Sequence, residues 1–345
     1  MENGLPPFIS VIIPTYERPA RLLRCLSALE TQDFPPDRFE VLVVDDGGAT
    51  PLTGLIDSLR HRLNVTLLRQ PHAGPATARN YGASHARGSY FAFTDDDCTP
   101  APDWLLRLSA SFTQFPECVL GGRTVNELAG NPYSTASQLL VDFLYACWNP
   151  TTQEATFFAS NNLALSAKCF NSVGGFDVQW DRAAGEDRDL CDRLLGHGYR
   201  LIYVSDAVVH HAHSLTFRSF CRQHFNYGWG AHRLHKLRAK RTGNHVQFAS
   251  LTFYLRAAVY PFRQHTPVRK TGLVALLLGV AQAANTVGWV AAALNKIGTG
   301  LSTHDKAFEI RRDRNIEDTS MLRANQRRSS VMVSVKRMLK FLGRA

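Results

Sequence analysis

Short apolar runs alternate with helix-like segments along the first hundred residues, and this alternation limits the fold more than any other feature of the sequence. The runs cover residues 8–13, 41–44, 65–68 and 90–94. Apolar runs of this length, bounded by turn residues, predict buried strands. Strands that alternate with helices form mostly parallel sheets through right-handed crossovers. We therefore expect an α/β fold in which helices flank a mostly parallel sheet.

Later segments extend this pattern less regularly. We expect a strand at 201–204 and an extended stretch at 157–165. Leucines at helical spacing start near Leu22, and helices are predicted over residues 52–62, 74–86, 104–115, 186–195 and 217–240. More than one of these predicted helices therefore follows a turn that is acidic or rich in glycine.

Acidic clusters directly follow two of the predicted strands. Asp45 and Asp46 follow the second, and Asp95, Asp96 and Asp97 follow the fourth. In open α/β sheets, ligands bind beyond the carboxyl ends of the strands, so we expect these carboxylates on one rim. Carboxylates at i and i+2 can present oxygens to Mg²⁺ or Mn²⁺, usually completed by phosphate. The alternative is a solvated acidic turn that caps the next helix.

Three weaker patterns have both a functional and a structural interpretation. Glu17 and Asp46 can accept hydrogen bonds from a base or a ribose, or can simply shape Asp-Gly turns. Arg79 follows the third strand on a predicted helix and could equally be a surface arginine. Glu186 and Asp187 precede an apolar helix, where one could act as a general base. Helix capping and the helix dipole would also favour acids there.

Together these segments resemble glycosyltransferase family 2, the large inverting family with the GT-A (Rossmann-like) fold. The resemblance runs from about residue 8 to about residue 227. It is carried, in family order, by SVIIPTYERP, VLVVDDGG, GPATARNYG, FAFTDDDC, NNLALSAKCFNSVGGFD, GEDRDL and VVHHAH. Each motif alone is weak, but the ordered set at these spacings is specific.

The resemblance implies roles for the donor-binding residues. Pro14, Tyr16 and Asp46 would line the nucleoside pocket, and Arg79 would lie near the base or the phosphates. Asp95 and Asp97 would form the D-x-D pair, with Asp97 as the direct ligand of Mg²⁺ or Mn²⁺ and Asp95 near the ribose or a metal-bound water.

Catalytic roles follow from the same resemblance. Asp187 would be the catalytic base and Glu186 would orient the acceptor, in a single displacement that inverts the anomeric carbon. Asp96 is a further candidate for donor binding, because the D-x-D pair could be read in a shifted register. The resemblance therefore implies a metal-dependent transferase that moves a sugar from a nucleotide-diphosphate donor to an acceptor hydroxyl.

Two other functions remain as alternatives. A sugar nucleotidyltransferase would use a similar site, but such enzymes usually carry a glycine-rich, lysine-bearing loop where this chain has Pro14-Thr15-Tyr16-Glu17. A non-catalytic relative that binds a nucleotide sugar or a partner is the other. A nucleic-acid partner is not expected, because no helix-turn-helix, zinc-finger or aromatic RNA-binding motif accompanies the basic residues.

Polar and aromatic residues elsewhere supply further candidates. His210, His211 and His213 follow a predicted strand, where neighbouring side chains alternate in direction, so the three cannot all serve one site. His211 is a candidate metal ligand, and its alternative is packing. Asn161 and Asn162 are candidates for sugar or acceptor contacts. Trp229 could stack on a sugar ring or belong to the core.

Charge divides the chain into an acidic body and a basic tail. The net charge of +10 combines −8 over residues 1–217 with +18 over residues 218–345. The uncharged segment 273–294 is long enough to span a bilayer core of about 30 Å, or could form a buried or interfacial hairpin. A final amphipathic helix at 331–345 fits a membrane surface or a docking site. Basic clusters beside apolar segments favour anionic lipid.

These observations define three segments. We expect a GT-A domain over residues 1–235, a basic and apolar membrane-associating helical segment over 236–300, and a basic linker with a terminal helix over 301–345. Seven widely spaced cysteines without a C-x-x-C pattern favour a reducing compartment. The first ten residues lack the pattern of a signal peptide. We therefore expect the catalytic domain on the cytoplasmic face of the membrane, with a glycan, lipid-linked or small-molecule acceptor.

Overall fold

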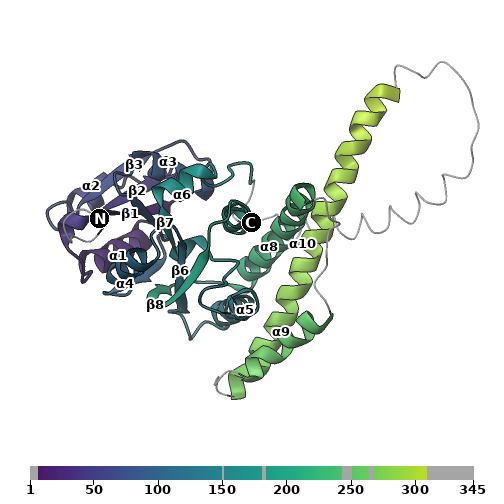
Figure 1. The fold of residues 1–345 in the computed structure, drawn as a ribbon. Coiled ribbons are helices and arrows are strands. Elements are labelled where there is room, and N and C mark those ends of the chain that lie inside the picture. Colours follow the sequence, from purple (N-terminus) through teal and green to yellow (C-terminus); the bar gives the residue numbers. More distant parts are fainter. Residues whose placement is uncertain (1–6, 150, 181–183, 243–250, 264–267, 309–345) are drawn as a thin grey trace, which may run out of the picture. The chain divides into compact units, whose positions relative to one another are not determined.

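The computed structural model describes residues 7–149, 151–180, 184–242, 251–263 and 268–308, and its central element is one mixed sheet (Figure 1). The strands are β1 Ile9–Thr15, β2 Phe39–Asp45, β3 Val65–Arg69, β4 Tyr90–Phe93, β5 Cys98–Pro100, β6 Val119–Asn126, β7 Leu163–Ser166 and β8 Leu201–His211. The α-helices are α1 Pro19–Glu30, α2 Thr53–Asp57, α3 Pro75–His85, α4 Trp104–Gln114, α5 Pro132–Trp148, α6 Ala167–Ser172, α7 Glu186–Gly196, α8 Phe217–Thr242, α9 Leu251–Arg263 and α10 Val268–Phe308. Two short 3-10 helices cover Pro36–Arg38 and Ser160–Asn162.

The strand order in the described sheet is β3-β2-β1-β4-β7-β6-β8-β5. The first half is parallel, since β1 pairs in parallel with both β2 and β4, and β2 with β3. The second half is mixed: β7 is antiparallel to β4 and β6, β5 is antiparallel to β8, and β6 and β8 are parallel. The expected α/β architecture is confirmed, with the parallel pairing concentrated among the N-terminal strands.

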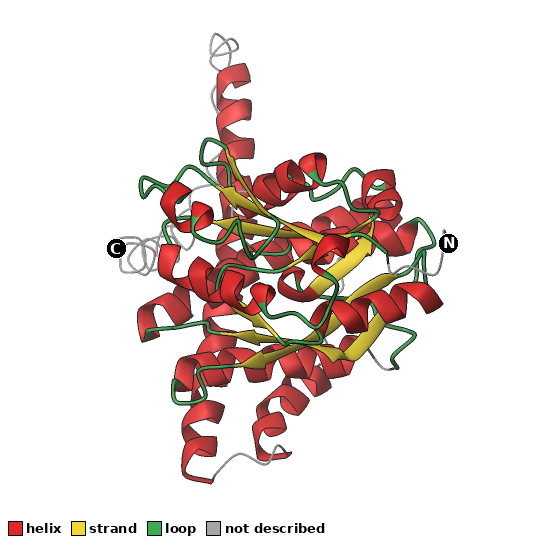
Figure 2. Cartoon of the chain, turned by 90° about the vertical axis from the view of Figure 1, so that its left-hand side faces the viewer, coloured by secondary structure: helices red, strands yellow, loops and turns green. Residues whose placement is uncertain are grey.

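Helices cover both faces of the sheet because the central strands are apolar on both sides (Figure 2). In β1, Val11 and Ile13 join a core cluster with the leucines of α1 and α4, whereas Ile12 joins the opposite cluster with α3 and α6. Successive side chains of a strand point to opposite faces, so one continuous apolar run supplies both cores. Burial on both faces holds the strands in place. It therefore also positions their ends, which form the rim where the acidic residues lie.

Several elements differ from the sequence-based expectations. Helix α2 ends at Asp57 instead of residue 62, and the chain continues in tighter turns, such as the hydrogen bond from Leu59 N–H to the Ile56 carbonyl at 3.0 Å. Strand β8 extends to His211 instead of ending at residue 204, past exposed polar residues at a register shift against β6. Helices α5 and α9 and strand β6 were not predicted.

The C-terminal part of the chain is more helical than expected. Helix α10 runs over 41 residues and includes residues 301–308, which the sequence suggested as linker. Within the described residues, Thr271–Asn295 is the segment long and apolar enough to cross a membrane, a test that a core helix of a soluble protein can also pass. The predicted terminal helix at 331–345 lies outside the described residues.

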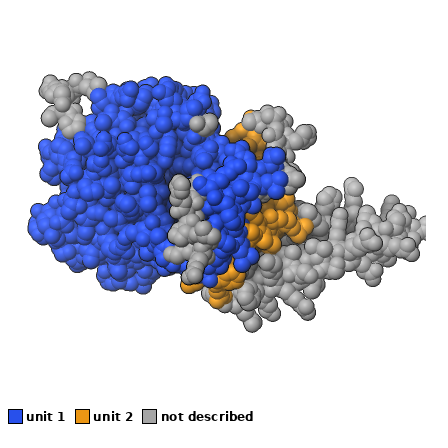
Figure 3. Space-filling model, turned by 90° about the horizontal axis from the view of Figure 1, so that it is seen from below, with its two compact units in different colours: residues 1–215, 248–278 blue, residues 216–247, 279–345 orange. Residues whose placement is uncertain are grey.

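The chain divides into two compact units, which are coloured separately in Figure 3. One comprises residues 1–215 and 248–278, and the other comprises residues 216–247 and 279–345. These units interleave along the chain, so their boundaries differ from the consecutive segments 1–235, 236–300 and 301–345. The sheet, all of its strands and helix α9 belong to the first unit.

Candidate functional site

The carboxyl ends of the parallel strands bring the predicted acidic clusters to one rim of the sheet. In the parallel register Thr15 lies beside Asp45, at the ends of β1 and β2. Asp95 follows β4, the other neighbour of β1. Strand β5 then pairs Cys98 with His211, which places the end of β8 against the same acidic turn. The backbone pairing of these strands therefore suffices to bring the residues of the rim together.

Three consecutive aspartates on this rim point in different directions. Asp95 Oδ1 accepts a hydrogen bond from Arg79 Nη2 at 2.7 Å. The buried Asp96 accepts a hydrogen bond from Thr15 Oγ1 at 2.7 Å and another from Arg18 Nη1 at 3.1 Å. Burial raises the pKa of Asp96 to about 6, against the lowering effects of Arg18 and Thr15. The donor contact that we predicted for Asp96 is not favoured by this geometry, because both of its oxygens serve the fold.

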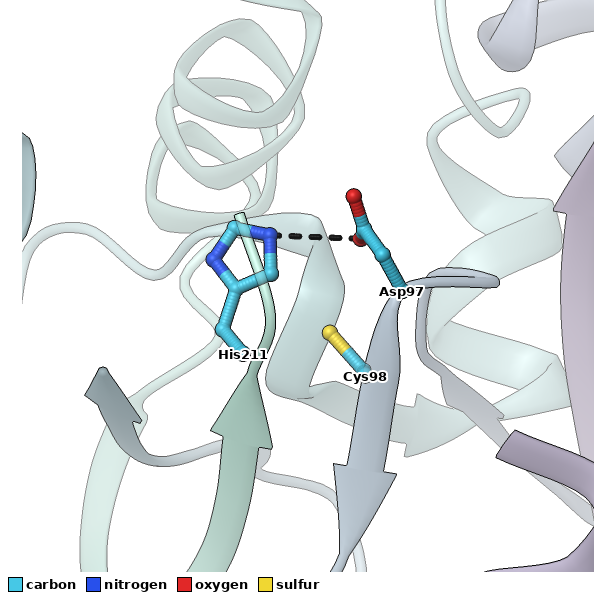
Figure 4. A group of neighbouring side chains, drawn as sticks. All are labelled: Asp97, Cys98 and His211. Atoms are coloured by element: carbon cyan, nitrogen blue, oxygen red, sulfur yellow. Dashed lines mark ion pairs between the residues drawn. The ribbon is translucent and has the colours of Figure 1, made fainter. Parts of the chain in front are cut away.

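Asp97 faces His211, the last residue of β8 (Figure 4). Its Oδ1 lies 3.2 Å from His211 Nε2, and its Oδ2 lies 3.1 Å from Arg21 Nη1. Ligand atoms of Asp97, Cys98 and His211 all lie within 4.8 Å of one another. Burial raises the pKa of the Cys98 thiol well above its ordinary value, so this sulfur stays protonated. The oxygen and nitrogen donors are thus Asp97 and His211.

Electrostatic interactions around Asp97 favour its ionised form. Burial alone would raise the pKa of Asp97, but the hydrogen bond and charge of His211, together with Arg18, hold it well below its usual range. Burial would lower the pKa of His211, yet the bond to Asp97 raises it. His213 stacks on His211 with ring centroids 4.9 Å apart, and burial together with that neighbour lowers its pKa to about 4. An ionised carboxylate with two nearby imidazoles is a suitable donor set for a divalent cation.

Arg79 connects two acidic motifs that lie about ninety residues apart in the sequence. The guanidinium is buried, with Nη2 2.7 Å from Asp95 Oδ1 and Nη1 3.4 Å from Glu186 Oε1. Its carbon lies 5.4 Å from the centre of the Phe176 ring. Among the described residues, Arg79 Nε and Glu186 Oε2 are buried without a hydrogen-bond partner. Buried polar atoms are normally paired, so these two mark a place for a polar ligand.

The first turn of α7 carries two carboxylates with raised pKa values. Burial and the charge of Asp187 raise the pKa of Glu186 to about 7, although Arg79 lowers it. Burial likewise raises the pKa of Asp187, against the lowering effects of Arg188 and Arg79. Asp187 Oδ1 accepts a hydrogen bond from the Arg188 amide at 2.7 Å. A carboxylate with a raised pKa beside a buried guanidinium has the properties of a general base.

Two of the predicted nucleoside contacts play different parts in the structure. Asp46 supports a loop, and Tyr16 presents an exposed ring. Asp46 is buried and accepts bonds from Gln70 Nε2 at 2.7 Å, Ala73 N–H at 2.9 Å and Gly74 N–H at 2.8 Å. Its carboxylate therefore holds residues 70–74 in place. Tyr16 is 46% exposed at the rim, and its ring centre lies 4.3 Å from that of His72. An exposed aromatic ring of this kind is the better candidate for stacking on a base.

Pro14 and Glu17 flank this ring and support the turn. Pro14 is buried as part of β1, where it pairs with Val44. Glu17 has a positive φ of 55° and is exposed, and it accepts hydrogen bonds from the Ala49 amide and from Thr50 Oγ1. These bonds lower the pKa of Glu17. The described geometry gives both residues a structural part in shaping the donor side of the rim.

Asn162 is occupied inside the protein. Its Oδ1 accepts from Trp104 Nε1 at 2.9 Å, and its Nδ2 donates to the Arg123 carbonyl at 3.1 Å and the Ala207 carbonyl at 3.0 Å. The side chain is almost wholly buried, so the predicted sugar contact is not favoured. Asn161 Oδ1 accepts from Thr124 Oγ1 at 3.3 Å. Trp229 belongs to α8 in the second unit, and its sugar contact stays a prediction.

Sequence reasoning missed several residues of the rim. Arg18 and Arg21 reach the acidic turn, and the ring of His72 lies against that of Tyr16. A signal for the arginines existed: they lie three residues apart around the start of α1, directly after β1. The i and i+2 spacing of His211 and His213 also indicated a common side.

Fold comparison places the chain in a known class of proteins. The chain has the GT-A architecture, as shown by its similarity to the mannosyltransferase PcManGT from Pyrobaculum calidifontis. The two align with a TM-score of 0.54 and 21% identity, over 87% of this chain and 81% of the other. That structure is described as a complex with GDP-Man and Mn²⁺.

The sequence comparison agrees with the motifs. Residues 10–176, just under half of the chain, match the family model "Glycosyl transferase family 2", as the motifs predicted. The chain is 31% identical over 228 residues to a pre-mycofactocin glycosyltransferase of Mycobacterium tuberculosis, a match that covers 65% of this chain and 46% of the relative. It is 27% identical over 227 residues to glycosyltransferase AglE of Haloferax volcanii, covering 65% and 73%. The chain thus spans about half the length of the mycobacterial relative.

The raised pKa of Glu186 predicts a pH-dependent contribution to stability. The folded pKa of about 7 lies above the ordinary 4.5, so the folded protein holds this proton more tightly and the free energy of unfolding falls as pH rises between these values. Glu186→Gln removes this titration. Relative to the wild type, the variant should become more stable by up to about 3 kcal/mol as pH rises from 4.5 to about 7.5, measured by urea denaturation. Equal pH dependence of both proteins would contradict the assignment.

Proposed function

We propose that this protein transfers a glycosyl group from a nucleoside-diphosphate sugar to an acceptor hydroxyl, with inversion at the anomeric carbon. The observation that carries the proposal is the buried Arg79, which joins Asp95 to Glu186 and leaves a polar atom of Arg79 and one of Glu186 without partners. A guanidinium in this position can stabilise the charge that develops on a departing diphosphate. The match to the family model and the glycosyltransferase relatives named above support the same activity.

Each candidate side chain has a distinct part in this proposal. Asp187 takes the proton from the acceptor hydroxyl, since its raised pKa makes it a stronger base than an exposed aspartate. Glu186 orients the acceptor and Tyr16 stacks on the base. Asp95 lies beside Arg79, near the ribose and diphosphate. Holding donor and acceptor in line would supply much of the rate.

Asp97 and His211 would hold Mg²⁺ or Mn²⁺, with Asp95 nearby. The donor set fits, because hard divalent cations take carboxylate oxygen and imidazole nitrogen and the adjacent Cys98 thiol stays protonated. When bound, such an ion neutralises charge on the diphosphate. Its binding would require His211 to be neutral and would therefore weaken at low pH.

Two alternative activities predict different results with the same substrates. A sugar nucleotidyltransferase would release pyrophosphate from a nucleoside triphosphate and a sugar phosphate. A non-catalytic relative would bind the donor and release nothing. The grouping of Asp95, Glu186 and Asp187 around the guanidinium of Arg79 favours transfer over both.

Donor binding should depend on the metal through Asp97. With Mn²⁺ present, at least one nucleoside diphosphate should raise the Tm of the wild type, and Asp97→Ala should abolish that shift. Thermal denaturation with and without Mn²⁺ measures it. Asp57→Ala is the matched control, because Asp57 is an exposed acid paired with Arg60 on α2. An equal shift without metal, or in Asp97→Ala, would exclude this metal site.

Transfer should depend on Asp187 separately from donor binding. Asp187→Asn keeps the size of the side chain but removes the base, so the rate of nucleoside diphosphate release should fall by roughly 10²–10⁴ while the metal-dependent Tm shift remains. Release from a panel of nucleotide sugars measures the rate. Asp192→Asn, also on α7, should keep the rate. Loss of both binding and release in Asp187→Asn would assign the residue to structure.

We also propose that the C-terminal helices attach the protein to the cytoplasmic face of a membrane rich in anionic lipid. Leu255, Val259 and Phe262 are exposed at helical spacing on α9, close in sequence to Arg256 and Arg263. Apolar residues beside basic ones suit the interface of an anionic bilayer. Whether residues 271–295 span the bilayer or lie in its surface is open in this proposal, as are the segment boundaries at 235 and 300.

Attachment can be measured by flotation. The protein should float with phosphatidylcholine vesicles that contain phosphatidylglycerol, and less with phosphatidylcholine alone. Phe262→Glu on α9 should weaken flotation, whereas Leu106→Glu, at an exposed leucine of α4, should not. Equal recovery with both kinds of vesicle, or no flotation at all, would contradict the anionic-membrane proposal.

A further inference from the structure

A cavity of about 780 Å³ lies in the first unit, and neither the acidic turn at residues 95–97 nor the first turn of α7 contributes to its lining. Its walls come from β6, α5, β8, α9 and the beginning of α10. Helix α9 packs on α5 through Phe143, whose ring centre lies 5.1 Å from that of Phe253 and 5.4 Å from that of Tyr260. A volume of this size is typical of small-molecule sites.

The lining combines aromatic rings with two ionisable groups. Tyr145, Tyr203 and Tyr260 supply the rings. Asp142 also lines the cavity, and its Oδ1 accepts a hydrogen bond from Gln138 Nε2 at 2.8 Å. Burial raises the pKa of Asp142 to about 6, although Gln138 and Arg123 lower it.

Arg123 is the second ionisable group. It is exposed on β6, and its guanidinium has no ion pair or hydrogen bond to the residues that the structure describes. A carboxylate with spare acceptor capacity and an available guanidinium can both bind hydroxyl groups. Tyrosine rings offer flat apolar faces to the carbon skeleton of the same ligand.

Residues 159–161 connect this cavity to the candidate base. Tyr145 Oη accepts a hydrogen bond from the Ala159 amide at 2.8 Å, and Thr124, also in the lining, donates to Asn161 at 3.3 Å. Between these contacts, the Ser160 backbone hydrogen-bonds Asp187 and lowers its pKa. The charge of Asp187 in turn contributes to the raised pKa of Tyr145. The inner wall of the cavity is therefore next to the group that would deprotonate an acceptor.

We infer that this cavity is the acceptor subsite and that it takes a polyhydroxylated ring, a saccharide or cyclitol, with hydroxyls on Asp142 and Arg123 and its ring on the tyrosines. This inference rests on the glycosyl transfer proposed above. A purely alkyl acceptor would remove water from Asp142 and Arg123. It would offer these groups no hydrogen bonds in place of those they made with water, which costs free energy. The mixed lining thus favours a sugar-like ligand.

The cavity can be tested separately from the donor site by two measurements on each protein. The first is nucleoside diphosphate release with water as the acceptor, from the nucleotide sugar that stabilises the protein. The second is the same release with methyl glycosides of glucose, galactose, mannose and N-acetylglucosamine, with myo-inositol, and with farnesyl phosphate as an apolar probe. Ala146→Trp fills the cavity from an exposed position of α5, and Asp142→Asn removes the charge. Ala110→Trp, at an exposed alanine of α4, is the matched control.

At least one of the sugar-like probes should accelerate release by the wild type and by Ala110→Trp. The acceleration should fall about tenfold or more in Ala146→Trp and in Asp142→Asn, because a hydrogen bond to a charged group is lost or the space is filled. Release to water and the metal-dependent Tm shift should persist in both variants.

Three results would overturn the inference. One is acceleration that survives unchanged in Ala146→Trp and Asp142→Asn. Another is acceleration by farnesyl phosphate and by none of the sugar-like probes. The third is a wild type that releases diphosphate to water but responds to no probe. A wild type that neither binds nor cleaves any nucleotide sugar would instead refute the proposed function, and the acceptor subsite with it.

Discussion

The buried guanidinium of Arg79 is the interaction on which the rest of the site depends. Asp95 and Glu186 come from motifs about ninety residues apart, and each would carry an uncompensated charge near the other without a cation between them. Two like charges in a partly buried place are unfavourable unless neutralised. Arg79 meets this requirement from α3, which the sheet positions beside both motifs. The ion pairs therefore join the donor side of the rim to the proposed catalytic base.

The same principle explains why the three consecutive aspartates have different partners. Asp95 is paired with Arg79, Asp96 with Thr15 and Arg18, and Asp97 with His211 and Arg21. Each carboxylate has its own cationic or hydrogen-bonding partner, so three adjacent acids can coexist at the end of a buried strand. Asp95 and Asp97, at i and i+2, stay the predicted contacts of the donor and the metal.

Local patterns in the sequence predicted the strands and the rim, because apolar runs and acidic turns act over a few residues. Long-range effects were not predictable in that way. The inward rotation of Asp96 depends on Arg18, which comes from another element, and the burial of Asn162 depends on carbonyls of β6 and β8. At Gly122, a Cβ atom would lie 2.4 Å from Asn162 Nδ2, a close approach that only the folded chain reveals. The cavity under α5 is likewise formed by elements from five parts of the chain.

The central claim, that Arg79 holds two otherwise repelling acidic motifs together, is tested most directly by a double-mutant cycle on the free energy of unfolding. Above the pKa of Glu186, Arg79→Met alone should destabilise the protein by about 3–5 kcal/mol, because Asp95 loses its partner and Glu186 must either stay a buried charge without a counterion or take up a proton. Adding Glu186→Gln should recover part of that loss, with a coupling energy of about 2 kcal/mol. If the two effects simply add to within about 0.5 kcal/mol, the two residues do not depend on each other and the account is wrong.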